Sequence, residues 1–506
     1  MEVVYDNLVG QEMVVVDTMQ LKSEHKAELP ANAKKVMGVT CQVLAQTSTV
    51  QDNEITISGN LVMRLVFINE LEKYDSQDIV QPYEKKITVK DLSGINNVNG
   101  ETQIASCQWD IQDNALQATV ILNVTINGTK EKNTRMVSDL AGEVEVRKLE
   151  QKILTFNAVL ADQFEIEEQI ELDSNCEGVL GVDTNAFIKD VAASDGKVAV
   201  KGVVAVNIMG VKTVDGSNVP YNTMYEIEFA KSLVVTGTTA EDLATGTAKV
   251  NGVTLHVENG SKGSVLVLKV ELQFRGCSYV YKNCQSVVDA ISFDKELAFE
   301  TSQFEHAEIL PQVNTTVDLE NNMNLPANMP YIARVLAVDG IKINDLAINA
   351  ADGKAVLTGV LVANVLVENE EHLASNYLAE APFQTHVRWD ALDGEYQVKA
   401  TVVPLSLNVK ARRGVELLLD AKLGISLQAS TTKVTTMVTA VVVGKDKTDD
   451  GSAIRIYIIG DKENLWDLAK RTNLSCAELL KQNPNLENGC TPGERIVVYR
   501  HEKVAL

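Results

Sequence analysis

Alternating apolar and polar residues follow the same kind of turn at three places along the chain. The turns begin at Asp52, Asp195 and Asp352, and a glycine follows each aspartate by seven residues: Gly59, Gly202 and Gly359. Asp-Asn and Asp-Gly pairs suit the tight turn of a β-hairpin, and alternation at period two predicts a strand with one buried face. A glycine on that face indicates a bulge, a bend or a close approach of another part of the chain.

On each of these three strands, an apolar residue stands at nearly every second position, and we predict that these residues face inward. They are Ile55, Ile57, Leu61, Met63 and Leu65; Val198, Val200, Val204, Val206 and Ile208; and Leu357, Leu361, Ala363 and Val365. A second strand recurs farther along, starting at Leu116, Leu266 and Leu417. The repeating unit of about 150 residues is domain-sized, so we expect duplicated domains and not a solenoid.

Val, Ile and Thr are frequent in these segments, which lie between Gly, Asn and Asp clusters, and this pattern favours antiparallel sandwiches or barrels with few helices. The expected fold is mainly β. It consists of three tandem β-rich domains at residues 1–147, 148–291 and 292–433, then a connecting strand and polar linker at 434–453. Superposing the three Asp turns and Gly strands would test the triplication.

Residues 454–500 change to the pattern strand, helix, helix, strand. Ile454, Ile456 and Ile458 alternate as a strand, and Asn464 is placed to cap a helix that begins at Leu465. Ser475 opens a second helix with capping-box spacing, and Pro484 ends it. This segment resembles the LysM family in three motifs: Leu465-Trp466-x-Leu468-Ala469, Leu479-Leu480-x-x-Asn483-Pro484-Asn485 and Pro492-Gly493-x-x-Ile496.

The LysM resemblance implies a βααβ domain that binds N-acetylglucosamine chains of peptidoglycan or chitin, or docks on a protein. Sugar-binding members carry Gly-Asp-Thr directly before the Leu-Trp pair, whereas this chain has Lys462, Glu463 and Asn464 there. We therefore expect weakened glycan binding. The candidate groove residues are Lys462, Glu463, Asn464, Trp466, Asn485, Leu486, Glu487 and Asn488; for Trp466, a core position and an interface position both remain open.

Three β-rich units followed by one LysM domain resemble the SPOCS-domain morphogenetic proteins of spore-forming Firmicutes. That resemblance implies a scaffold in spore-coat assembly on the cytoplasmic, mother-cell side of the developing spore. Its implied partner is a polymerising coat ATPase, which docks on the LysM domain. Two alternatives stay open: a glycan-binding protein, and a homo-oligomeric filament or layer subunit that assembles through its edge strands.

The net charge and the residue patterns of the chain argue against several classes of function. A net charge of −23 disfavours nucleic acid, whose phosphates are bound by Lys and Arg. No apolar run approaches the roughly 18 residues of a membrane span. The six histidines are scattered without metal-ligand spacing, and no nucleophile or phosphate-loop motif occurs, so we expect a non-enzymatic protein without cofactor or metal.

The seven cysteines are Cys41, Cys107, Cys176, Cys277, Cys284, Cys476 and Cys490. Their odd number, wide scatter and lack of Cys-x-x-Cys spacing favour reduced thiols in a cytosol. Cys476 and Cys490 share the C-terminal segment, so a pairing between them is the one alternative considered.

Overall fold

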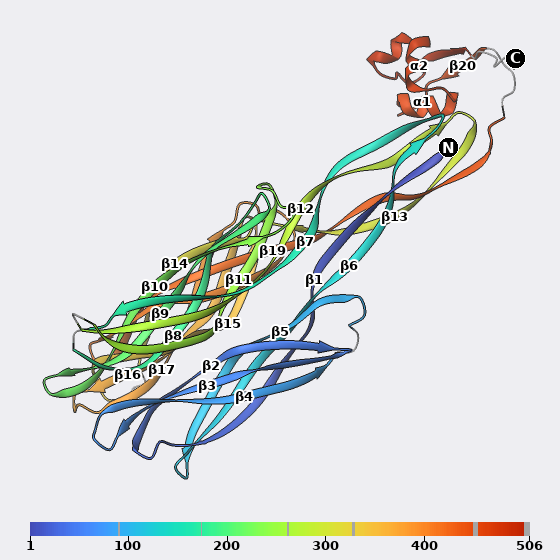
Figure 1. The fold of residues 1–506 in the computed structure, drawn as a ribbon. Coiled ribbons are helices and arrows are strands. Elements are labelled where there is room, and N and C mark those ends of the chain that lie inside the picture. The colour runs from blue at the N-terminus through green and yellow to red at the C-terminus, as the bar shows by residue number, and fades with distance from the viewer. Residues whose placement is uncertain (90–91, 174, 261–262, 326–328, 449–453, 500–506) are drawn as a thin grey trace.

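The computed structural model describes residues 1–506 except 90–91, 174, 261–262, 326–328, 449–453 and 500–506. The molecule is elongated, with a wide end of packed sheets, a narrow stalk of long strands and a small C-terminal module at the far tip (Figure 1). The expectation of a mainly β fold is confirmed: the described part of residues 1–448 contains strands and turns but no helix.

Three successive sets of strands, called units 1, 2 and 3, build the wide end and the stalk. Unit 1 contains β1 (Glu2–Glu28), β2 (Ala33–Gln51), β3 (Glu54–Asn69), β4 (Tyr74–Thr88), β5 (Ile95–Gln112) and β6 (Ala115–Ala141). Unit 2 contains β7 (Val144–Glu171), β8 (Cys176–Ser194), β9 (Lys197–Val214), β10 (Ser217–Val234), β11 (Leu243–Gly260) and β12 (Gly263–Ser292). Unit 3 contains β13 (Lys295–Ile309), β14 (Val313–Asn324), β15 (Ile332–Ala351), β16 (Lys354–Asn369), β17 (Ala374–Arg388), β18 (Gln397–Arg412) and β19 (Glu416–Asp446).

Each unit has two antiparallel sheets with the same strand order. One sheet is β2-β3-β4 in unit 1, β10-β9-β8 in unit 2 and β15-β16-β17 in unit 3. The other is β1-β6-β5, then β11-β12-β7, and in unit 3 the central strand β19 pairs with β13, β14 and β18. Strands β13 and β14 together thus take the place that β1 and β7 hold in the other units.

The landmark glycines lie on the middle strands β3, β9 and β16. In each unit the strand on one side has a register shift opposite or beside the glycine. On the other side an aromatic residue pairs with it directly, and these pairs are Gly59 with Tyr83, Gly202 with Phe229, and Gly359 with Phe383. A Cβ atom at Gly202 would lie 2.5 Å from the Phe229 ring, so the glycine makes room for the aromatic side chain.

The turns before these strands use backbone conformations that Asp and Gly tolerate. Asp52 has φ 53°, Gly196 has φ 70° and Gly353 has φ 74°. The predicted inward rows on β3, β9 and β16 are confirmed, because every listed member is at most 1% exposed. They pack against the equally buried rows that begin at Leu116, Leu266 and Leu417 on β6, β12 and β19.

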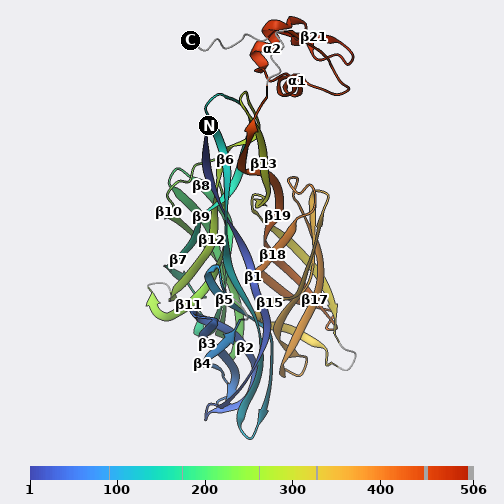
Figure 2. The ribbon, with the colours of Figure 1, turned by 90° about the vertical axis from the view of Figure 1, so that its right-hand side faces the viewer.

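The outer faces of the middle strands are apolar as well, and the three units meet through them. Val66, Met209 and Leu366 stand seven residues after the three glycines and form one cluster. Met37 of β2, Leu180 of β8 and Leu336 of β15 belong to the same cluster, together with Val211, Val219 and Ala337. Corresponding positions of the three units therefore pack together, and Figure 2 shows the units grouped around the lower part of the long strands.

Hydrogen bonds and an ion pair also join the three units to one another. The Arg64 guanidinium donates to the Val182 carbonyl oxygen at 3.1 Å and pairs with Asp183 at 3.3 Å. At the corresponding position of unit 2, Asn207 donates to the Val338 carbonyl oxygen of unit 3 at 2.9 Å. Lys35 of unit 1 donates to the Ala374 carbonyl oxygen of unit 3, so each unit is joined to both others.

The stalk consists of the upper parts of three strand pairs, β1 with β6, β7 with β12 and β13 with β19. One cluster of its interior contains a residue from each strand: Leu8, Met136, Ile153, Cys284, Phe304 and Met437. A second cluster contains Val137, Leu140, Val287, Ala290 and Val438. The turns between units lie at 142–143 and 293–294, so the expected boundaries at 147 and 291 fall a few residues inside β7 and β12. Likewise 434–446 is the stalk part of β19, while 449–453 of the expected linker lies outside the described residues.

One expectation about cysteines is wrong. A disulfide joins Cys41 of β2 to Cys107 of β5, with the Cα atoms 6.6 Å apart. These strands belong to different sheets of unit 1, and the pairing of two residues distant in sequence depends on sheet packing that no spacing rule contains. The other five cysteines are free, including Cys476 and Cys490.

Candidate functional site

The C-terminal module contains β20 (Ile454–Ile458), α1 (Leu465–Thr472), α2 (Cys476–Gln482), the 3₁₀-helix η1 (Pro484–Asn488) and β21 (Arg495–Tyr499). Asn464 accepts from the backbone N–H groups of Trp466 and Asp467, and Asp467 accepts from the Asn464 N–H, which completes a capping box. Asn483 is buried and ties α2 to β21 by exchanging hydrogen bonds with the Val497 backbone.

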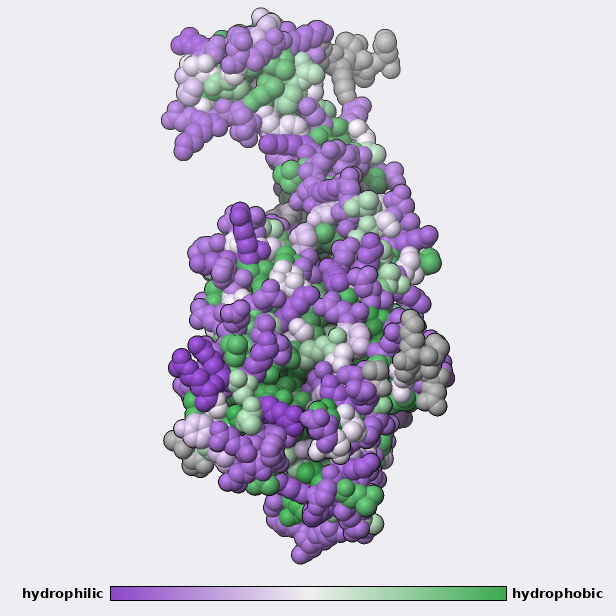
Figure 3. Space-filling view, turned by 90° about the vertical axis from the view of Figure 1, so that its left-hand side faces the viewer, coloured by the Kyte–Doolittle hydropathy of each residue, from purple (hydrophilic) through white to green (hydrophobic). Residues whose placement is uncertain are grey.

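The outer face of the β20–β21 sheet carries large apolar side chains that remain exposed. Ile454, Ile456 and Ile458 are 59%, 66% and 57% exposed, and Tyr499 beside Ile454 is 50% exposed. The inner face holds Ile496 and Val498, which are fully buried. Figure 3 shows apolar atoms exposed on the surface of the module. We call Ile454, Ile456, Ile458, Val497 and Tyr499 the outer face.

The loop before α1 uses two of its three candidate residues to hold its own shape. Glu463 accepts from the Gly460 N–H at 2.6 Å and from Arg471 at 3.1 Å, and Asn464 is the helix cap. Lys462 is exposed and has φ 65°, the left-handed conformation in which glycine is normally favoured.

The loop after α2 contributes polar groups and one core residue. Leu486 is 3% exposed and belongs to the module core, whereas Glu487 and Asn488 are exposed. Asn485 donates to Glu494 at 2.6 Å. Burial raises the pKa of the Cys490 thiol, and the carboxylates of Glu463, Glu494 and Asp467 raise it further.

Trp466 faces the stalk and not the space between the two loops. Its side chain is half-buried, and the indole N–H donates to the Asp289 carboxylate of β12 at 2.8 Å. Ile291 and Phe293 at the stalk tip join the apolar cluster of the module. The eight candidate residues therefore separate into four exposed polar residues, two that hold the loop before α1 (Glu463 and Asn464), the core residue Leu486, and Trp466 at an internal interface.

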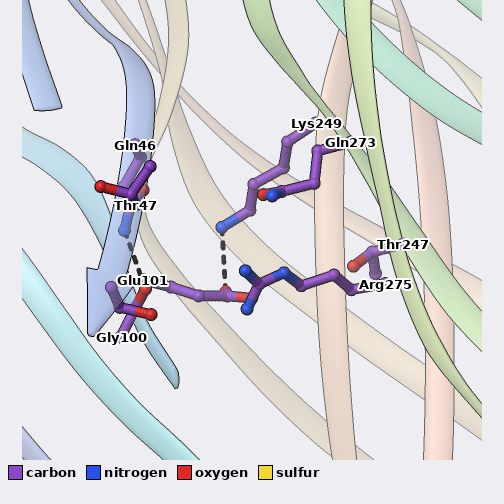
Figure 4. A pocket seen from close by; sticks show the side chains of 9 residues that line it. Gln46, Thr47, Gly100, Glu101, Thr247, Lys249, Gln273 and Arg275 are labelled. Carbon is purple, nitrogen blue, oxygen red and sulfur yellow. Dashed lines mark hydrogen bonds and ion pairs between the residues drawn. The ribbon is translucent and has the colours of Figure 1, made fainter. Parts of the chain in front are cut away.

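A small pocket between units 1 and 2 contains a partly exposed ion pair (Figure 4). Lys249 donates to Glu101 at 2.9 Å, and Arg275 lies beside them. Burial raises the pKa of Glu101, but Lys249, Arg275 and Lys399 lower it more, so its pKa is below the usual value. The pocket has a volume of about 10 Å³, enough for one water molecule, and its polar residues join the two units.

Within the described residues, no group of three or more His, Cys, Asp or Glu side chains is arranged to hold a metal ion. His372 contacts Glu368, His306 contacts Thr435 and His256 contacts Glu258, each as a separate pair. No helix in the described ranges is long and apolar enough to cross a membrane.

Sequence reasoning missed two features of this site. The alternation of Ile454, Ile456 and Ile458 predicted a strand, but it did not show which side of the strand would be covered. Arg455 and Tyr457 between them pair with the buried positions Val498 and Ile496, although by residue type the isoleucines would be expected to face inward. The contact of Trp466 with Asp289 joins residues 177 positions apart and has no local signal.

Compared with known proteins, the chain matches no protein-family model and no curated protein sequence.

Proposed function

We propose that this chain is a non-enzymatic scaffold of spore-envelope assembly that docks a partner protein through its C-terminal, LysM-like module. The observation that carries the proposal is the outer face. Three isoleucines and a tyrosine are about half or more exposed on one small sheet, although apolar side chains of this size are normally buried. A contiguous exposed apolar patch is typical of an interaction surface.

The organisation of the rest of the chain supports a scaffold. Three units packed through corresponding apolar positions and a stalk with a continuous interior make a long, firm body that presents the module at one end. The resemblance to SPOCS-domain proteins supplies the proposed setting, the mother-cell side of the developing spore, and the proposed partner, a polymerising coat ATPase.

The alternative is glycan binding by the two loops of the module. It is favoured by four polar side chains of these loops that are exposed to solvent: Lys462, Asn485, Glu487 and Asn488. Against it, Lys462 replaces the small residue that lets a sugar ring approach the backbone, and Glu463 is held by Gly460 and Arg471.

Titration with N-acetylglucosamine oligomers separates the two proposals. The full chain is the appropriate sample, since Ile291 and Phe293 of the stalk belong to the module's apolar cluster. We expect no binding at millimolar sugar, which corresponds to about 4 kcal/mol, and improved binding after Gly, Asp and Thr are placed at 462–464. Micromolar binding by the native chain would reject protein docking as the first proposal in favour of glycan recognition.

A further inference from the structure

Asp289 at the end of the stalk holds two side chains of the module at once. One carboxylate oxygen accepts from the Trp466 indole N–H at 2.8 Å, and the other pairs with the Lys470 ammonium group. The two donors stand one helical turn apart on α1, so both reach the same carboxylate. The Asp289 side chain is only 23% exposed, which limits competition from water for these bonds.

Other contacts at the stalk tip surround this carboxylate. The Cys476 N–H at the start of α2 donates to the Glu145 carboxylate of β7 at 2.8 Å. Asn473 donates to the Phe293 carbonyl oxygen at 2.8 Å, and Lys447 bridges the Ser292 carbonyl and the Asn473 side chain. The module is therefore held on one side by α1, the turn after α1 and the start of α2.

The contacts between the module and the stalk are partly apolar and partly polar. The apolar part is small, because Ile291 and Phe293 are the stalk residues in the module's cluster. Most of the remaining contacts are polar, and among them the Asp289 carboxylate accepts from two side chains of α1. Charge-assisted hydrogen bonds of low exposure are stronger than neutral ones, so we expect the loss of the Asp289 carboxylate to weaken the docked state strongly.

We propose that Asp289 is a conformational latch that holds the module on the stalk, and that its release exposes the Trp466 side of the module. With the latch closed, the side of α1 that carries Trp466 is covered, while the outer face of β20–β21 stays in solvent. With the latch open, the module has a second accessible side. The latch goes beyond the proposed function, because it concerns the chain's own interface and needs no external partner.

Amide hydrogen exchange of the full chain tests the latch. In Asp289→Ala, the Cys476 amide, which donates to Glu145, should exchange about tenfold faster or more, since a charged partner of two donors is lost. The Val497 amide, bonded to Asn483 inside the module, should keep its rate and so separate release from unfolding. Asp289→Asn keeps an acceptor for the indole but loses the charge, and we expect an intermediate increase.

Asp6→Ala is the matched control, because Asp6 is an exposed stalk carboxylate that accepts from the backbone N–H of its neighbour Asn7. It should exchange like the unmodified chain. Two outcomes would overturn the latch: unchanged Cys476 exchange in both Asp289 variants, or equal acceleration of Cys476 and Val497 in Asp289→Asn, which would mean that Asp289 supports folding of the module and not its docking.

Discussion

Asp339 carries the most perturbed carboxyl group at the meeting point of the three units. Burial raises its pKa to about 7, the Asp183 charge contributes to the increase, and Asn364 and Arg64 oppose it. Burial lowers the pKa of Arg64, but Asp183, Asp78 and Asp339 raise it more, so Arg64 stays charged. Two acidic side chains and one basic side chain from three units thus meet here, and the proton on Asp339 reduces the repulsion between Asp339 and Asp183.

This environment predicts a pH dependence of stability. The folded pKa of Asp339 lies above its unfolded value, so the folded state binds the extra proton, and stability falls as pH rises from about 4 to about 7. Asp339→Asn should remove this part of the slope and raise the free energy of unfolding at pH 8 by on the order of 1–3 kcal/mol. Urea unfolding at pH 5 and pH 8 measures it.

Asp318→Asn is the control for Asp339, because it removes an exposed carboxylate from β14 of the same unit. Its unfolding profile should follow that of the unmodified chain. If Asp339→Asn lowered stability at pH 8, or if its pH slope equalled that of Asp318→Asn, the account of the three-unit junction would be wrong.

At the scale of single strands, close packing at the landmark glycines has a measurable consequence. A Cβ atom at Gly202 would lie 2.4 Å from the Phe187 carbonyl oxygen and 2.5 Å from the Phe229 ring. Gly202→Ala should therefore lower the free energy of unfolding by about 1–3 kcal/mol, the usual cost of overpacking. Thermal unfolding of the variant measures the loss.

Gly178→Ala on β8 provides the comparison, since its Cβ atom would meet only Val211 at an ordinary 3.8 Å. We expect a change smaller than 0.5 kcal/mol, as is usual away from tight packing. Equal melting temperatures for the two variants would show that the glycine on β9 is not needed for the Phe229 contact.

The strands themselves were largely predictable because their signals are local. Alternation identified the buried rows of β3, β9 and β16, and Asp-Asn and Asp-Gly pairs identified their turns. The sequence also contains a signal for the apolar outer faces. Val203–Met209 is almost continuously apolar, as expected for a strand buried on both sides. The disulfide between Cys41 and Cys107 has no local sequence signal, because it depends on how two sheets pack.

At the scale of the whole molecule, the arrangement around a common interior was not predicted. Positions such as Val66, Met209 and Leu366 correspond in sequence, but nothing local states that corresponding positions of different units touch each other. The same holds for the candidate site. Sequence motifs located the module and its loops, whereas the docking of Trp466 on Asp289 and the exposure of the three isoleucines depend on which faces the fold covers.

The central claim, docking through the outer face, is tested most directly by measuring the affinity of the full chain for a purified polymerising coat ATPase. Ile456→Lys places a charge in the middle of the outer face, while Val434→Lys places one at another exposed apolar position, on β19. We expect the unmodified chain and Val434→Lys to bind alike, and Ile456→Lys to bind about tenfold or more weakly. Equal binding by all three, or no binding by the unmodified chain, would contradict the account.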